Sequence, residues 1–166
     1  TVCWVLDICN AKVNDSCGFH VHMDAAGFNL DTWKNLTLTY KHLEHLIDAF
    51  MPRTRRNNTY CKTLSGVSDE RIKSVRTIDG LREVFNNDRY HKVNFEAYSS
   101  HLTVEFRQHS GTTNFTKMEN WIRFLNGLIT FAKRSSLPSR MTLEELPFLD
   151  GKQKLFFKLR TKKLAV

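Results

Sequence analysis

Two histidines and an aspartate alternate with apolar residues in the segment FHVHMD, residues 19–24. Strict alternation is typical of a β-strand that buries one face, and it places His20, His22 and Asp24 together on the other face. Two imidazoles and a carboxylate on one face suit zinc or iron. Two strand histidines held by hydrogen bonds would show the same pattern, so the spacing alone leaves a metal site and a structural pair open.

The length of the chain excludes one common setting for such a histidine pair. At 166 residues, the chain is the size of one ordinary domain. The metal-dependent barrels that carry HxH on their first strand need roughly 200 residues or more. A cupin site is also disfavoured, because it requires a glutamate within a few residues and the next glutamate here is Glu44.

A second alternating segment, HLTVEFRQH at residues 101–109, directs Thr103, Glu105 and Arg107 to the face opposite Leu102, Val104 and Phe106. Glu105 and Arg107 are two residues apart on one strand face, a separation of roughly 7 Å. They are close enough to serve one phosphate-bearing site, the carboxylate through a metal ion and the guanidinium through a bidentate hydrogen bond. An exposed cross-strand ion pair is the structural alternative.

The elements that must position these side chains follow from hydrophobic spacing. Strands are predicted over 18–24, 90–98 and 101–109, and helices over 31–50, 69–87 and 113–134. Asp31 is the predicted N-cap of the first helix, and Gly80 interrupts the second. Thr116 and Glu119 have the spacing of a capping box at the start of the third. The order predicts an α+β domain, an antiparallel sheet with packed helices, while residues 141–160 give mixed signals.

Positive charge gathers in two segments of a chain with 25 Lys and Arg against 17 Asp and Glu. Residues 51–62 contain four basic residues and no acidic one, and their turn-forming residues predict a loop. Residues 151–166 contain six basic residues and no acidic one, which would suit an acidic partner or a solvated tail. No apolar stretch is long enough for a membrane span, and the four cysteines form no CxxC pair. A cytoplasmic protein is therefore expected.

Three blocks of the sequence together resemble a known family. CGFHVHMDA, PRTRRNNTYCK and DRYHKVNFEAYSSHLTVEFRQHSGTTNFTKMENWIRFL occur in the order seen in the amidoligase family, which is assigned to the glutamine-synthetase-like carboxylate–amine ligases. The resemblance runs from about Val13 to Ala132. It implies a partial glutamine-synthetase-like catalytic domain over residues 1–135, with residues 136–166 as a C-terminal extension that ends in the basic tail.

The resemblance also implies a chemistry and a site. An enzyme of this type would use ATP with Mg²⁺ or Mn²⁺ to activate a carboxylate as an acyl phosphate, which an amine then displaces. His20 and Glu105 match the positions of its metal ligands, and Arg107 and Arg89 match arginines that contact phosphate. His22 shares the face as a catalytic or substrate-contacting group. The loop that carries Arg55 and Arg56 would meet the nucleotide or the substrate carboxylate.

One part of the family pattern has no counterpart in this chain. The family opens on a strand with paired acidic residues that supply further metal ligands, and residues 1–14 contain no such pair. The site is therefore expected to need an upstream segment or a partner chain to complete it. Otherwise the chain keeps the fold as a non-catalytic structural or interaction protein that binds acidic partners through its basic tail. The carboxylate and amine substrates stay open among amino acids, peptides and proteins.

Overall fold

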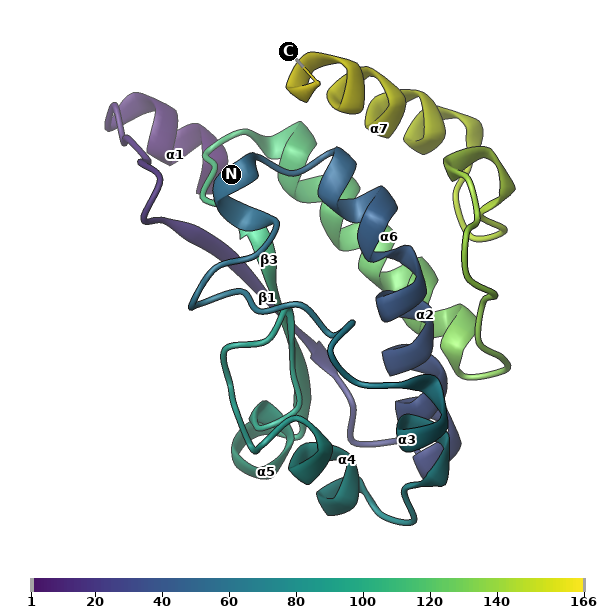
Figure 1. Cartoon of the computed structure of the whole chain (residues 1–166). Helices are drawn as coiled ribbons and strands as arrows, with labels where there is room; N and C mark the ends of the chain where they lie inside the picture. The colour runs from purple at the N-terminus through teal and green to yellow at the C-terminus, as the bar shows by residue number, and fades with distance from the viewer. Residues whose placement is uncertain (1, 166) are drawn as a thin grey trace.

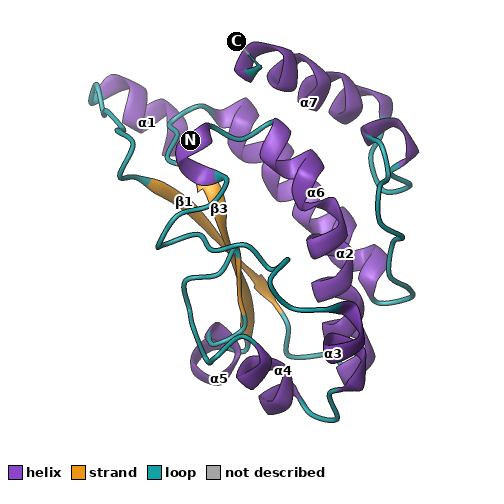
Figure 2. Ribbon diagram, viewed as in Figure 1, coloured by secondary structure: helices purple, strands orange, loops and turns teal. Residues whose placement is uncertain are grey.

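A three-stranded antiparallel sheet forms the centre of the computed structural model, which describes residues 2–165. The strands are β1 (Gly18–Asp24), β2 (Val93–Asn94) and β3 (Thr103–Ser110), in the order β1-β3-β2. The α-helices are α1 (Val2–Ile8), α2 (Leu30–Ala49), α3 (Asp69–Ser74), α4 (Ile78–Val84), α5 (Ala97–His101), α6 (Phe115–Ala132) and α7 (Gly151–Leu164), with short 3₁₀ turns at η1 (Arg53–Arg55) and η2 (Leu143–Glu145). Figures 1 and 2 show α2 and α6 together beside the sheet. The predicted α+β class is confirmed.

The two long helices pack on the sheet through the faces that their spacing predicts. Trp33, Leu36 and Tyr40 of α2 are almost fully buried, and the Tyr40 ring lies 5.7 Å from that of Phe106 on β3. On α6, the ring of Trp121 stacks on that of Phe124 in the same core. Burial of this apolar face supplies the main driving force for docking helix on sheet.

Both predicted N-caps were wrong by two residues. Asn29, not Asp31, caps α2, since its side chain accepts the backbone N–H of Thr32. Asn114 caps α6 in the same way through the backbone N–H of Lys117, so Thr116 lies inside the helix. In both places an asparagine two residues upstream offers the side-chain oxygen that an N-cap needs. Asparagine is as strong an N-cap residue as the predicted Asp31 or Thr116.

Two predicted elements between residues 69 and 98 are shorter than expected. The helix over 69–87 is split into α3 and α4 at residues 75–77, where Thr77 caps α4, and Gly80 lies within α4. The strand over 90–98 is reduced to the two residues of β2 and is followed by α5. The side chain of Asn94 accepts the backbone N–H of Glu96, a local turn that competes with continued pairing in the sheet.

A bulge in β3 changes which layer its last residues face. Phe19 of β1 pairs with His109 and Val21 pairs with Phe106, so two residues of β3 lie opposite His20 alone. The extra residue returns His109 to the helix side, where its ring lies 5.7 Å from those of both Phe19 and Trp121. Bulges re-aim side chains in this way.

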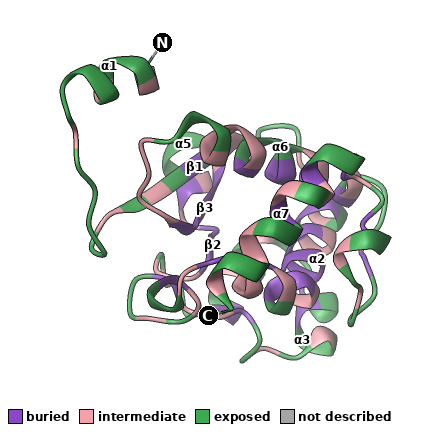
Figure 3. Ribbon diagram, turned by 90° about the horizontal axis from the view of Figure 1, so that it is seen from above, coloured by how far each residue is buried: buried purple, intermediate pink, exposed green. Residues whose placement is uncertain are grey.

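The basic C-terminal segment forms a helix that packs on the core. The Phe157 ring of α7 lies 4.4 Å from that of Phe50 and 5.5 Å from that of Phe124. Arg160 Nε donates to the carbonyl of Phe50 at 2.7 Å, at the C-terminal end of α2. In contrast, α1 at the other end of the chain (Figure 3) has no buried residue and contacts α6 through Cys3 Sγ, 3.5 Å from Met118 Sδ. No helix within residues 2–165 is long and apolar enough to cross a bilayer.

Replacing Gly127 by alanine should destabilise the protein although it removes a glycine from α6. A Cβ there would lie 2.9 Å from the Phe148 ring and 3.1 Å from the Phe148 carbonyl oxygen. The helix propensity gain of about 1 kcal/mol is expected to be outweighed by overpacking that costs roughly 2 kcal/mol. The measurement is the free energy of unfolding in urea. Gly151→Ala is the control because its Cβ would meet no atom within 4 Å; equal or greater stability of Gly127→Ala would contradict the packing argument.

Candidate functional site

Glu105 lies at the centre of a polar cluster drawn from all three strands. The residue is 4% exposed. On one carboxylate oxygen, Oε1, His20 Nδ1 of β1 lies at 3.0 Å and Arg107 Nη1 donates at 2.8 Å. On the other, Asn94 Nδ2 of β2 donates to Oε2 at 2.6 Å. His22, which pairs with Glu105 in the sheet, places Nε2 3.7 Å from Oε1.

These partners keep the Glu105 carboxylate ionised. Burial alone would raise its pKa, but the hydrogen bonds from His20 and Asn94 and the charge of Arg107 outweigh burial and lower the pKa to about 2. An anionic group with such a low pKa is available at neutral pH to a cation. The predicted grouping of His20, His22, Glu105 and Arg107 on one face of the sheet is what the structure shows.

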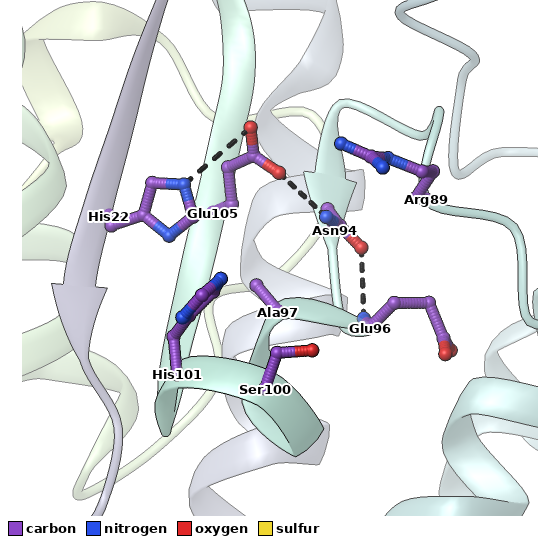
Figure 4. A pocket seen from close by; sticks show the side chains of 8 residues that line it. All are labelled: His22, Arg89, Asn94, Glu96, Ala97, Ser100, His101 and Glu105. Atoms are coloured by element: carbon purple, nitrogen blue, oxygen red, sulfur yellow. Dashed lines mark hydrogen bonds and ion pairs between the residues drawn. The ribbon is translucent and has the colours of Figure 1, made fainter.

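A cavity of about 210 Å³ opens on the His22 side of this carboxylate. Its lining residues are His22, Arg89, Asn94, Glu96, Ala97, Ser100, His101 and Glu105, and Figure 4 shows the His22 and His101 rings on one side of it and Arg89 on the other. Nδ1 of His22 lies 2.9 Å from Thr103 Oγ1, so Nε2 is the ring atom that faces Glu105. The His101 ring stands edge-on to that of His22 at 6.0 Å.

Two arginines flank the ring of Tyr90 beside the cavity. The guanidinium carbon of Arg107 lies 5.5 Å from the ring centroid and that of Arg89 lies 5.7 Å from it. Arg107 is buried and paired with Glu105, whereas Arg89 is exposed and lines the cavity. The predicted phosphate-contacting arginines are thus close together, one held in place by a carboxylate and one exposed at the cavity.

Arg55 and Arg56, also predicted to face the ligand, bind backbone instead. Arg55 is 5% exposed, and its guanidinium donates to the carbonyls of Arg107 and Gln108 on β3. Because β2 is only two residues long, these carbonyls lie beyond the end of the neighbouring strand. Arg56 Nε donates to the carbonyl of Met51 at 3.1 Å. Arg55 therefore positions β3, and neither arginine lines the Glu105 cavity.

The two predicted metal ligands, His20 and Glu105, lie next to each other. His20 Nδ1 and Glu105 Oε1 are 3.0 Å apart, a separation that two neighbouring ligands of one cation can have. Within residues 2–165, no three His, Cys, Asp or Glu side chains are grouped to hold a metal ion. The pair fits a cation such as Mg²⁺ that takes one or two protein ligands and fills its remaining positions with water and phosphate oxygens.

Glycine at position 18 makes room for His20. A Cβ at Gly18 would lie 2.7 Å from His20 Nε2 and 3.1 Å from Arg55 Nη2. The imidazole thus folds back over the backbone of its own strand, with Nδ1 directed at Glu105. Asp24, the third polar residue of the HxHxD segment, instead accepts the backbone N–H of Ala26 at the end of β1.

Four polar residues of the cavity were missed by the sequence analysis. Asn94, Glu96, Ser100 and His101 all line it. Asn94 could have been found, because an antiparallel strand over 90–98 places its polar residues opposite those of the next strand, and Asn94 does pair with Glu105. Ser100 and His101 could not, since they reach the cavity on α5, a helix that the alternating pattern around it does not predict.

Fold and site together define an α+β protein with a charged cavity beside an antiparallel sheet, suited to a charged ligand. The chain belongs to the family described as "Putative amidoligase enzyme", whose model matches residues 5–129. The match contains every site residue named above, and it indicates a ligase activity. No curated protein and no solved structure matches the chain.

Removing the charge of Glu105 should change how stability depends on pH. Its pKa is about 2 in the fold against 4.5 ordinarily, so the ion pair stabilises the protein above about pH 4.5 and is lost as the pH falls toward 2. Glu105→Gln should cost about 3 kcal/mol at pH 7 because Arg107 loses its buried counter-charge. The difference from the parent protein should shrink at pH 3.

Urea unfolding at pH 7 and pH 3 measures this difference. Glu119→Gln is the matched control, since that carboxylate pairs with Arg123 at the surface and should contribute little at either pH. A Glu105→Gln difference that is the same at both pH values would contradict an ionised buried carboxylate.

Replacing Arg55 should damage the fold, whereas replacing Arg56 should not. Arg55→Ala would leave two β3 carbonyls without their donors and open a space beside the strand, for a loss of about 3 kcal/mol. Arg56→Ala removes one hydrogen bond of a half-buried side chain and should cost about 1 kcal/mol or less. Thermal unfolding of the two variants distinguishes them. Equal losses would show that the β3 carbonyls do not depend on Arg55.

Proposed function

We propose that this protein is an ATP-dependent carboxylate–amine ligase with a glutamine-synthetase-like catalytic site, or the larger part of one. The observation that carries the proposal is the convergence of His20, Asn94 and Arg107 on the ionised Glu105 carboxylate next to the cavity. Acyl-phosphate chemistry needs positioning and charge neutralisation more than a strong acid or base. An anionic ligand for a cation, flanked by two guanidiniums, supports that chemistry.

In the proposed reaction, a substrate carboxylate oxygen takes the γ-phosphoryl group of ATP, and the bond from that phosphorus to ADP breaks. The amine nitrogen then attacks the acyl carbon, phosphate leaves with the electrons of the C–O bond, and the amine loses one proton. Nε2 of His22 faces the cavity and is placed to accept that proton. Arg89 and Arg107 would offset the charge of the phosphoryl group as it moves.

Glu105 and His20 would hold a divalent cation, Mg²⁺ or Mn²⁺, in this proposal. When bound, the cation would neutralise phosphate oxygens of ATP. In its absence, Arg107 is the charge that compensates Glu105. Binding of the cation therefore requires Arg107 to share or release the carboxylate, which would free its guanidinium for phosphate.

The further acidic ligands expected from the family are supplied by another strand in this proposal. Residues 2–8 form α1, and the chain between α1 and β1 contains no paired acids. β1 is the outer strand on its side of the described sheet, so its free edge can accept a strand from an upstream segment or a partner chain. Such a strand would lie next to His20 and His22.

Binding of a non-hydrolysable ATP analogue tests the site directly. Calorimetric titration of the full chain should show binding that depends on Mg²⁺, and Glu105→Gln and His20→Ala should each weaken it at least tenfold, because each removes a proposed ligand. Glu119→Gln, a surface carboxylate, is the matched control. Analogue binding that is unchanged by removing Mg²⁺ or by either site substitution would overturn the proposal, as would no binding after an acidic strand is supplied.

A second candidate is a non-catalytic protein that binds acidic partners through α7. Among the side chains described, Lys158 is the one basic residue of α7 that forms an ion pair, with Glu144 at 3.4 Å. Deleting residues 151–166 is an unsuitable test, since it removes Phe157 from the core. Replacing the exposed Lys152 and Lys162 by glutamine keeps the core intact. Loss of binding to an acidic peptide, with no affinity for the ATP analogue in either protein, would favour this candidate.

A further inference from the structure

A second cleft lies between the first turn of α6 and α7. Its volume is about 200 Å³, and it is lined by Lys117, Phe156, Leu159, Arg160 and Lys163. It shares no lining residue with the Glu105 cavity. The family match ends before α7, so this cleft is partly built from a segment that the match does not cover.

Three of the residues that line this cleft are basic. Within residues 2–165, Lys117, Arg160 and Lys163 form no ion pair with a carboxylate. Burial lowers the pKa of Lys117, and the charges of Arg160 and Lys163 lower it further. Burial also lowers the pKa of the Arg160 guanidinium. Like charges brought together in a partly buried place favour the binding of an anion.

The position of Arg160 is set by the fold and not by a ligand. Its Nε donates to the Phe50 carbonyl at the end of α2, and this contact leaves its terminal nitrogens for other partners. Lys117 lies in the first turn of α6, where the helix dipole adds positive potential. The cluster thus draws its charges from two helices and holds one of them rigidly, which reduces the entropy lost when an anion binds.

The walls of the cleft are apolar. Phe156 is half-buried, and Leu159 is 56% exposed although it is a large hydrophobic residue. A dianion balances more of the three positive charges than a single carboxylate does, and an apolar group on the same molecule would cover Leu159 and Phe156. We propose that this cleft binds a phosphate monoester attached to an apolar group.

Phenyl phosphate is the probe for a soluble ligand of this kind. Calorimetric titration of the full chain should give tighter binding for phenyl phosphate than for inorganic phosphate or benzoate, which lack the apolar group and the second charge respectively. Lys117→Gln and Lys163→Gln should each weaken it about tenfold, the effect of one charge-assisted hydrogen bond. Lys152→Gln is the matched control, because Lys152 is an exposed lysine of α7 that does not line the cleft.

Vesicles test whether the monoester belongs to a lipid. Co-sedimentation with phosphatidylcholine vesicles that contain phosphatidic acid should show the same dependence on Lys117 and Lys163 if the natural ligand is a lipid headgroup. Binding in either arm that the two cleft substitutions weaken supports the proposal. It is overturned if neither phenyl phosphate nor the vesicles bind, or if both variants bind as tightly as the parent.

The cleft and the ligase site can be tested separately. Glu105→Gln should leave phenyl phosphate binding unchanged, and Lys117→Gln should leave Mg²⁺-dependent binding of the ATP analogue unchanged, since the two sites share no residue. Loss of phenyl phosphate binding in Glu105→Gln would place the phosphate in the other cavity and overturn the cleft proposal.

Discussion

The arrangement of the sheet and of the candidate site depends on one buried negative charge on the central strand. The Glu105 carboxylate is almost completely removed from solvent, and an ionised group in such a place is stable only when it is paired and hydrogen-bonded. Its partners come one from each strand: His20 from β1, Asn94 from β2 and Arg107 from β3 itself. The same contacts that make the charge tolerable therefore fix how the three strands align. Fold and candidate site depend on one group, and a change that releases one partner weakens both.

The sheet is small, and side chains replace the strands that it lacks. β2 pairs with β3 over two residues only, so the second half of β3 has no strand partner on that side. Arg55 fills part of the gap with its guanidinium, and the backbone N–H of Arg107 bonds to the carbonyl of Lys92, just before β2. Buried backbone groups must find a partner somewhere. This requirement explains why an arginine of a basic loop, expected to meet a ligand, is buried against the strand.

Strand alternation and helix periodicity carried most of the information that the sequence offered. The alternation in β1 and β3 was enough to predict that His20, His22, Glu105 and Arg107 share a face, because side-chain direction in a strand depends only on parity. Odd and even numbering does not predict the side-chain direction of His109, because a bulge precedes it. It also does not apply to Ser100 and His101, because a local turn at Asn94 ends the strand before them. Asn29 and Asn114 cap their helices because of small local preferences between neighbouring residues. Arg55 bonds to the backbone of β3 because two segments distant in the sequence lie close together. A hydrophobic pattern gives information on neither of these two features.

The bulge opposite His20 divides β3 into two stretches with opposite parity. Up to Arg107, odd-numbered residues face the charged cluster, while at His109 an odd-numbered residue joins the aromatic core. Odd-numbered residues of β3 therefore face the charged cluster before the bulge and the core after it. Substitutions in the two stretches are constrained by different neighbours. Substitutions after the bulge can refit the helices without turning Glu105 or Arg107. A single-residue deletion at the bulge would restore regular alternation along the strand and leave core and site residues on their present faces.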